Sequence, residues 1–249
     1  MNAASNARPV ALITGAAKRI GAAIARALHA AGYDLALHYR HSRNEMDALC
    51  AELESARAGS TCPIQADLAD LGHLADIVEK CISRFGRLDA LVNNASAFYP
   101  TPIGSVTVAQ WNELFASNAQ APFFLAQAAA SHLKSARGGI VNIVDIYAER
   151  PLAGHAVYSM AKAALAMMTL ALAQELSPDV RVNAVAPGAV LWPDAGKDYA
   201  DREQLVARTP LRRTGTPEDL AAAVLFLLRD AKFTTGQIIK VDGGRSMVI

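Results

Sequence analysis

Short apolar runs alternate with longer stretches of helical periodicity along almost the whole chain. The apolar runs are rich in Val, Ile and Leu without clean alternation, as in strands buried on both faces, and lie at 10–14, 34–39, 61–66, 88–93, 139–144, 180–186 and 237–241. Helical patterns cover 20–31, 43–57, 70–84, 107–135, 155–176 and 217–230. This order predicts an α/β fold in a single domain, with a doubly wound, seven-stranded parallel sheet and helices on both faces.

Two segments fall outside this pattern. Residues 1–8 contain no long apolar run and are expected to form a flexible N-terminus. The stretch 188–215 is longer than a connection between two elements needs to be. In a compact domain such a segment is usually functional, so we predict a substrate loop or lid there.

Composition narrows the class of protein. The chain has 249 residues, is 52% hydrophobic and carries a net charge of +1, so neither a nucleic-acid surface nor a polyanionic tail is indicated. Its cysteines, Cys50, Cys62 and Cys81, form no CxxC motif and cannot all pair. We therefore expect a reduced, cytoplasmic protein, with no metal site. The sequence also suggests no secretion signal and no membrane span.

The first turn predicts an anion site. An apolar strand ends at Thr14, a turn begins at Gly15, and a helix starts near Ile20 and Gly21. Such a turn presents backbone N–H groups and a helix N-terminus to a diphosphate. The usual G-x-G-x-x-G is not matched, because Arg19 stands at its middle glycine. An ordinary βα turn is the alternative.

The end of the second strand indicates which dinucleotide would bind. An NAD site expects an acid about 20 residues on, whereas an NADP site expects a cation. Here Arg40, His41 and Ser42 follow the strand, with no carboxylate before Glu45. A guanidinium and a hydroxyl suit a 2′-phosphate, so NADP(H) is favoured over a solvated basic turn.

Polar residues also follow later strands, where ligands bind in open α/β sheets. Asp67 could cap the next helix or bond an adenine. The segment 93–98, NNASAF, could form an ordinary turn, and its Phe98 could stack on a ligand or pack under the loop.

Farther on, Pro122 removes the N–H that would bond the carbonyl of Asn118. A kink there would free that carbonyl for a water molecule, or have no function.

The stretch NIVDIYAERPLAGHAVYSMAK holds the catalytic candidates. Tyr158 and Lys162 are one helical turn apart, so they project from the same face. A nearby ammonium favours the phenolate and so lowers the pKa of the phenol. Asp145 precedes the pair, either as a strand-end turn residue or as a carboxylate that accepts ligand N–H groups and relays a proton.

The helical stretches 107–135 and 155–176 are apolar nearly all round. A helix without a polar face is buried on both sides. One face would cover the sheet, and the other would pack against another subunit, so we expect a homo-oligomer, with simple core burial as the alternative.

Together these residues resemble the short-chain dehydrogenase/reductase family over essentially the whole chain. The matching pieces are TGAAKRIG, Asp67-Leu68, NNA, Asn118, YSMAK, VRVNAVAPG and the terminal VDGG. Within that family the chain looks like the pteridine reductases, on four features: Arg19, HYRHS (38–42), NNASAFYPTP (93–102) and Asp145. The resemblance implies a single NADP-binding Rossmann domain over 1–249, a homotetramer, and NADPH-dependent reduction of pterins or dihydrofolate.

It also implies roles for particular residues. Tyr158 would be the acid, Lys162 would hold the nicotinamide ribose, and Asn118 would support a water in a proton relay. The pterin would lie between Phe98 and the nicotinamide. The implied cofactor set is Gly15, Lys18, Arg19, Ile20, His38, Tyr39, Arg40, His41, Ser42, Asp67, Leu68, Asn94, Ala95, Ser96, Tyr158, Lys162, Pro187 and Gly188. The implied substrate set is Arg19, Ser96, Phe98, Asp145, Tyr158 and Trp192.

Two other functions remain open at this stage. One is a carbonyl or 3-oxoacyl reductase in which Asp145 replaces the usual hydroxyl in its neutral form, because an ionised carboxylate would repel a developing oxyanion. A non-catalytic NADP(H)-binding module is the third reading, and Asn118, Tyr158 and Lys162 count against it.

Overall fold

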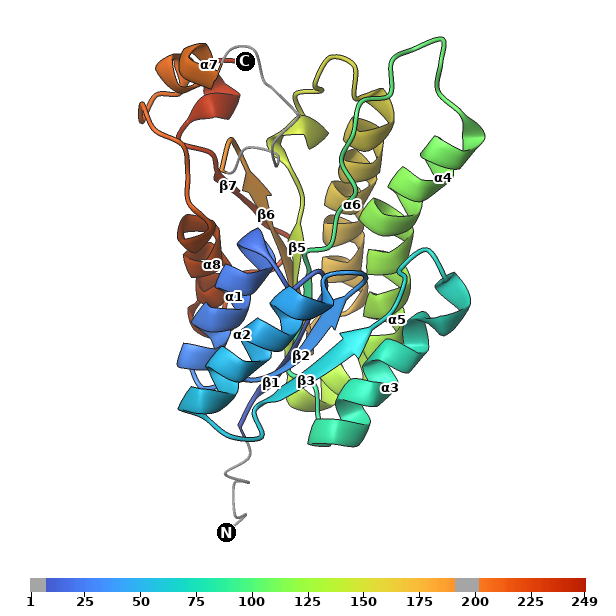
Figure 1. The fold of residues 1–249 in the computed structure, drawn as a ribbon, viewed down its shortest axis with the longest axis vertical. Helices are drawn as coiled ribbons and strands as arrows, with labels where there is room; N and C mark the ends of the chain where they lie inside the picture. The colour runs from blue at the N-terminus through green and yellow to red at the C-terminus, as the bar shows by residue number, and fades with distance from the viewer. Residues whose placement is uncertain (1–7, 191–201) are drawn as a thin grey trace.

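One parallel sheet organises residues 8–190 and 202–249, which the computed structural model describes (Figure 1). Seven strands of these residues pair in the order β3-β2-β1-β4-β5-β6-β7, and every neighbouring pair is parallel. Their bounds are β1 Val10–Ile13, β2 Asp34–Tyr39, β3 Thr61–Gln65, β4 Ala90–Asn93, β5 Gly139–Ile143, β6 Arg181–Pro187 and β7 Ile238–Val241. The predicted fold class is confirmed.

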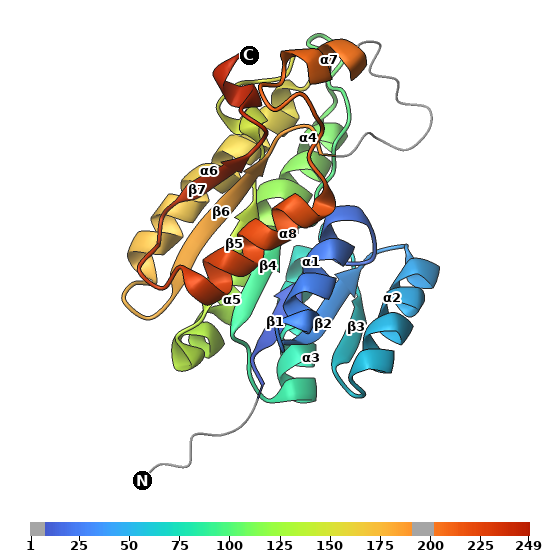
Figure 2. The same ribbon diagram turned by 90° about the vertical axis from the view of Figure 1, so that its left-hand side faces the viewer.

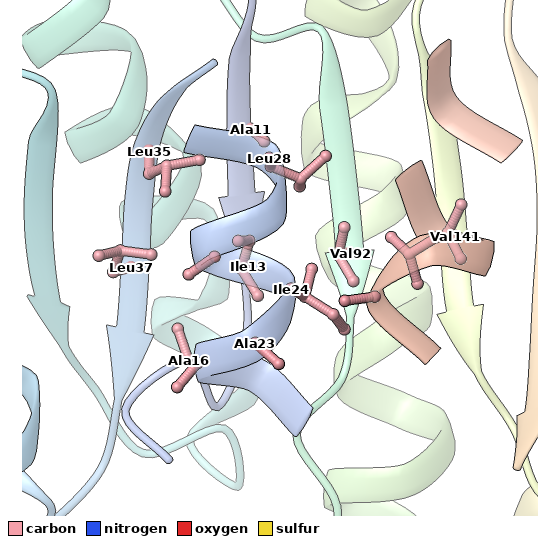
Figure 3. Packing of buried hydrophobic residues seen from close by; sticks show 14 of the residues in the cluster. Ala11, Ile13, Ala16, Ala23, Ile24, Leu28, Leu35, Leu37, Val92 and Val141 are labelled. Carbon is pink, nitrogen blue, oxygen red and sulfur yellow. The ribbon is translucent and has the colours of Figure 1, made fainter. Parts of the chain in front are cut away.

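Helices cover both faces of the sheet (Figure 2). One face carries α1 (Arg19–Ala30), α2 (Arg43–Ala56) and α8 (Pro217–Leu225), and the other carries α3 (Leu74–Phe85), α5 (Ala121–Ala136) and α6 (Ala156–Glu175). Successive residues of a strand pack against the helices on opposite faces of the sheet, since side chains alternate along a strand. Ile13 packs under Ile24 and Leu28 of α1 (Figure 3), whereas Leu12 packs with Leu125 of α5.

The predicted helix at 107–135 is interrupted where Pro122 indicated. It consists of α4 (Val108–Phe115), a π-helical turn (Ala116–Gln120) and α5. The N–H of Ala121 bonds the carbonyl of Ala116, five residues back. Proline has no N–H to bond the carbonyl four residues back. The wider π-helical turn just before it accommodates this missing hydrogen bond. The turn brings Asn118, which is fully buried, toward the carboxyl ends of the strands.

The strand order reverses between β1 and β4, and the crevice at the carboxyl ends of these strands is where ligands bind in such sheets. The predicted loop at 188–215 follows β6 at this edge and contains α7 (Arg202–Arg208), a helix that the sequence analysis did not predict. Residues 191–201, including Trp192, and residues 1–7 lie outside the described residues.

Helix α6 is long and apolar enough to cross a membrane by length and composition, and half of its apolar window is buried inside the molecule. Core helices of water-soluble proteins pass the same test, so this property alone is weak evidence for a span.

Candidate active site

A cavity of about 520 Å³ opens at the carboxyl ends of β1, β2 and β4. It brings together most of the predicted cofactor residues: Gly15, Lys18, Arg19, Ile20, His38, Tyr39, Arg40, His41, Ser42, Asp67, Leu68, Asn94, Ala95 and Ser96. Glu113 and Ser117, from α4 and the π-helical turn, also line it and were missed. They follow an irregular loop, and no local sequence signal pointed to them.

The turn after β1 is built around two glycines that no other residue could replace without strain. Gly15 has a φ of +62°, in the left-handed region. A Cβ on Gly21 would overlap the Gly15 carbonyl oxygen and lie 2.7 Å from Asn94 Nδ2. That amide donates to the carbonyls of Thr14 and Gly15 at 2.9 and 3.0 Å. Helix α1 therefore begins in direct contact with the turn.

The cavity fits an anionic dinucleotide. Helix α1 begins at Arg19. Its N-cap residue, Lys18, makes no side-chain hydrogen bond to the first backbone N–H groups of the helix. The cations Lys18, Arg19 and Arg40 line the cavity. Lys18 lies 2.6 Å from Glu45, and Arg40 lies 3.8 Å from Asp67. The glycine turn, the helix start and the cations suit a diphosphate and a second phosphate.

The catalytic candidates meet beside this cavity. Tyr158 and Lys162 lie on α6, and the side-chain nitrogen Nζ of Lys162 donates to the carbonyl of Ile143 at 2.8 Å. The same Nζ is 5.8 Å from the centroid of the Tyr158 ring. Lys162 is 2% exposed, and burial lowers its pKa to about 8, although the charge of Asp145 acts in the opposite direction.

Asp145 follows the end of β5 and bonds at both of its oxygens. Its Oδ2 accepts the hydroxyl of Tyr158 at 2.7 Å, and its Oδ1 accepts the N–H of Tyr147 at 2.9 Å, capping the short helical turn Ile146–Ala148. Burial raises the pKa of Asp145, while the bonds from Tyr158 and Tyr147 and the charge of Lys162 oppose the increase. The carboxylate is thus held in one orientation against the phenol.

One expectation about Tyr158 is wrong. The ammonium of Lys162 was expected to lower the pKa of this phenol, but the pKa is raised well above its ordinary value. Burial is the main cause and the charge of Asp145 is the next, while the nearby Ser96 side chain lowers the pKa. The phenol therefore keeps its proton at neutral pH, which a proton donor requires.

Asn118 holds the loop that follows β4. Its Nδ2 donates to the carbonyls of Ala97 and Leu114, both at 2.9 Å, and its Oδ1 accepts the hydroxyl of Ser96 at 2.7 Å. The side chain is thus engaged within the protein. It connects Ser96, which interacts with Tyr158, to the π-helical turn.

Phe98 lies at the site, with its ring edge-on to Tyr158 at a centroid distance of 4.7 Å. The sequence analysis missed its other neighbour: His155 stacks on Phe98, also at 4.7 Å, with 12° between the planes. The N–H of Thr101 bonds the carbonyl of Gly154, which joins the two loops. The only sequence signal was the place of His155 three residues before Tyr158.

The remaining predicted residues lie elsewhere. Pro187 ends β6, and Gly188 bonds the carbonyl of Val241; neither is among the described residues that line the cavity. A Cβ on Gly188 would lie 2.7 Å from Asp242, so this glycine serves close packing. Within the described residues no group of three or more His, Cys, Asp or Glu side chains could hold a metal ion.

Comparisons with known proteins agree with this geometry. A family profile described as "Enoyl-(Acyl carrier protein) reductase" matches residues 15–246. The chain belongs to the short-chain dehydrogenase/reductase family. It is therefore an oxidoreductase, and the family implies a nicotinamide cofactor.

Individual relatives differ in what they reduce. The chain is 39% identical to pteridine reductase 1 of Leishmania tarentolae over 280 aligned residues, with 96% of each chain covered. It is 35% identical to the 3-oxoacyl-[acyl-carrier-protein] reductase of Staphylococcus aureus over 242 residues, which cover 95% of this chain and 98% of that protein. An uncharacterised oxidoreductase of Methylorubrum extorquens is 39% identical, with 94% and 96% covered.

Proposed function

We propose that this oxidoreductase reduces a C=N bond of a dihydropterin, and of dihydrofolate as a related substrate, with NADPH as the reductant. The observation that carries the proposal is the 2.7 Å hydrogen bond between Tyr158 and Asp145. It sets a proton donor and a carboxylate acceptor side by side, next to the ring of Phe98.

The charge at Asp145 favours a nitrogen heterocycle over a ketone. Pterins carry ring N–H and amino groups, which a carboxylate accepts. A ketone develops negative charge on oxygen during reduction, and a carboxylate at this distance from the phenol would oppose that charge. Relatives of both kinds exist, so the side-chain chemistry of the site, rather than overall identity, supports the choice.

The residues of this chain have distinct parts in the reaction. NADPH, when bound, supplies the hydride to the carbon of the C=N bond. Tyr158 donates its proton to the nitrogen, so that a C–H and an N–H bond form as the C=N π bond breaks. Asp145 holds the substrate N–H groups and the phenol in line, and Lys162 supplies positive charge that stabilises the phenolate left behind. Phe98 supports one face of the flat ring.

The cations around the cavity support NADPH over NADH. Arg40, His41 and Ser42 line the wall where β2 ends, and Lys18 lies at the start of α1. A guanidinium, an ammonium and a hydroxyl form charge-assisted hydrogen bonds with a 2′-phosphate. We assign this group of four to the 2′-phosphate of the cofactor.

We also propose that the protein assembles as a homotetramer through α4, α5 and α6. These helices expose large apolar side chains away from the sheet: Val108, Trp111, Phe123, Phe124, Met160, Met167 and Leu170. Exposed apolar patches on a folded protein often mark a protein–protein interface. The double substitution of Met167 and Leu170 by Glu should convert the tetramer to smaller species in analytical ultracentrifugation.

The proposed compartment is the cytoplasm. Cys50, Cys62 and Cys81 are all free thiols in the structure, and burial raises the pKa of each. Unpaired thiols persist in a reducing compartment.

Steady-state oxidation of NADPH tests the function. Dihydropterins and dihydrofolate are compared with acetoacetyl thioesters, and each assay is repeated with NADH. Turnover of a dihydropterin with preference for NADPH supports the proposal. Turnover of thioesters alone would make the protein a carbonyl reductase, and tight cofactor binding without turnover of either set would make it a non-catalytic module.

A further inference from the structure

We propose that His38 is a positioning residue that holds the Gly15–Ala16 turn in the shape that receives the cofactor diphosphate. The inference rests on the proposed use of a nicotinamide dinucleotide in this cavity, and it assigns a role that the sequence left undefined.

The contacts of His38 join three strand ends. Its Nδ1 lies 3.2 Å from the backbone nitrogen of Gly15, and its own carbonyl accepts the N–H of Ala16 at 2.9 Å. Its Nε2 lies 3.1 Å from the carbonyl of Ala66, just after β3. The two N–H groups at the start of the turn are therefore bonded by one residue of β2.

One tautomer of the imidazole satisfies both side-chain contacts. The Gly15 N–H needs an acceptor and the Ala66 carbonyl needs a donor, so Nδ1 carries the lone pair and Nε2 carries the hydrogen. Burial lowers the pKa of His38 to about 4, while the Ala66 carbonyl and the charge of Asp67 act in the opposite direction. The ring is neutral at pH 7, as this arrangement requires.

Both ring nitrogens are thus used within the protein, and His38 is 2% exposed. It acts on the cofactor through the turn and not through a hydrogen bond of its own. The Gly15 carbonyl accepts from Asn94 and lies against Gly21 in the first turn of α1. If the Gly15 N–H lost its acceptor, this peptide could rotate, and the start of α1 would lose its support.

Two matched substitutions separate the ring nitrogens. In His38→Asn the amide oxygen lies close to the place of Nδ1, so the bond from Gly15 can be kept. In His38→Gln the amide nitrogen reaches the place of Nε2, so only the bond to Ala66 is kept.

Titration of NADPH and of NADH measures the effect. We expect His38→Gln to raise the Kd of both cofactors by about tenfold, because the diphosphate is common to both, and His38→Asn to raise it by less than about threefold. Each variant loses one buried hydrogen bond, so the thermal midpoint should fall in both, and the difference in Kd between the two variants is the readout that reports on Nδ1. Equal losses in the two variants, or no loss in either, would overturn the role of Nδ1.

The wild-type protein provides a second measurement that does not depend on the variants folding. In ¹⁵N-histidine NMR at pH 7, the ring of His38 should be the Nε2–H tautomer, and its Nδ1 resonance should shift when NADPH is added. An Nδ1–H tautomer would contradict the inference. If the wild type reduced only ketones, or preferred NADH, the proposed function would fail while the prediction for His38 remained measurable.

Discussion

The hydroxyl of Tyr158 donates to Oδ2 of Asp145 at 2.7 Å, while Oδ1 of the same carboxylate accepts the N–H of Tyr147 at 2.9 Å. Because both oxygens are bonded, the carboxylate cannot rotate without breaking a hydrogen bond. Burial raises the pKa of both Asp145 and Tyr158, and the charge of Asp145 raises that of Tyr158 further. In the proposed reaction, this is the proton that the substrate nitrogen would receive.

Replacing Asp145 tests the carboxylate directly. Asp145→Ala should lower kcat/KM for a dihydropterin by about 10²–10⁴-fold, because the substrate N–H groups lose their acceptor and the phenol loses its partner. Steady-state kinetics measures the loss, and circular dichroism checks that the fold is kept.

Asp145→Asn is the matched control for this change. It preserves the shape of the side chain and an oxygen for the Tyr147 N–H but removes the charge. It should be nearly as inactive as Asp145→Ala while binding NADPH with normal affinity. A near-normal rate in either variant would exclude the proposed role.

The lowered pKa of Lys162 predicts that, above neutral pH, activity falls while stability rises. Its pKa is lowered from 10.5 to about 8, so the ammonium loses its proton as the pH rises through 8, and kcat/KM for NADPH should fall there. Between about pH 8 and 10.5 the unfolded chain binds more protons than the folded one, so this group makes unfolding less favourable as the pH rises. Rate profiles and thermal midpoints from pH 7 to 10 measure both trends.

Lys162→Arg is the control for the pH effect. A guanidinium keeps its charge over this range, so the variant should be slower but show no inflection near pH 8. A wild-type profile that is flat to pH 10 would contradict the lowered pKa.

Much of the fold follows from local patterns in the sequence. The run 34–39 predicted β2 with the bounds that the structure has, because a strand buried on both faces is a continuous run of buried residues. Helix α7 was missed because its seven residues are too few to show a clear period. The π-helical turn before Pro122 was foreseen only as a kink, since a missing N–H shows where a helix is disturbed but not how it adapts.

The site was predictable as a set of residues but less so as a set of interactions. Strand-end positions brought most of the predicted cofactor residues together around one cavity, because the carboxyl ends of parallel strands share one edge. The stack of His155 on Phe98 joins loops 57 residues apart in the chain. The pKa of Tyr158 depends on how deeply it is buried, which spacing alone does not reveal.

Replacing Glu45 should change the preference of the enzyme for NADPH over NADH. It lies 2.6 Å from Lys18, and both side chains are about half exposed. Glu45→Gln should release Lys18 for the 2′-phosphate and raise the NADPH-over-NADH ratio of kcat/KM by about two- to fivefold, the modest effect expected of an exposed ion pair. Asp47→Asn, which removes the partner of Arg43 one turn along the same helix, is the control and should leave the ratio unchanged. A fall in the ratio for Glu45→Gln would contradict the assignment of Lys18.

Because His155 stacks on Phe98, substitutions at either residue should change the KM for the substrate without touching the reacting atoms. Phe98→Leu removes the aromatic face and should raise the KM for a dihydropterin by about three- to tenfold, the range of an aromatic pair. His155→Leu should raise it less, because it only loosens Phe98, whereas His155→Phe should restore it by keeping a flat ring at 4.7 Å. Because neither residue meets the proposed 2′-phosphate site, the KM for NADPH should remain unchanged in all three variants. An unchanged pterin KM in Phe98→Leu would show that the substrate does not lie against this ring.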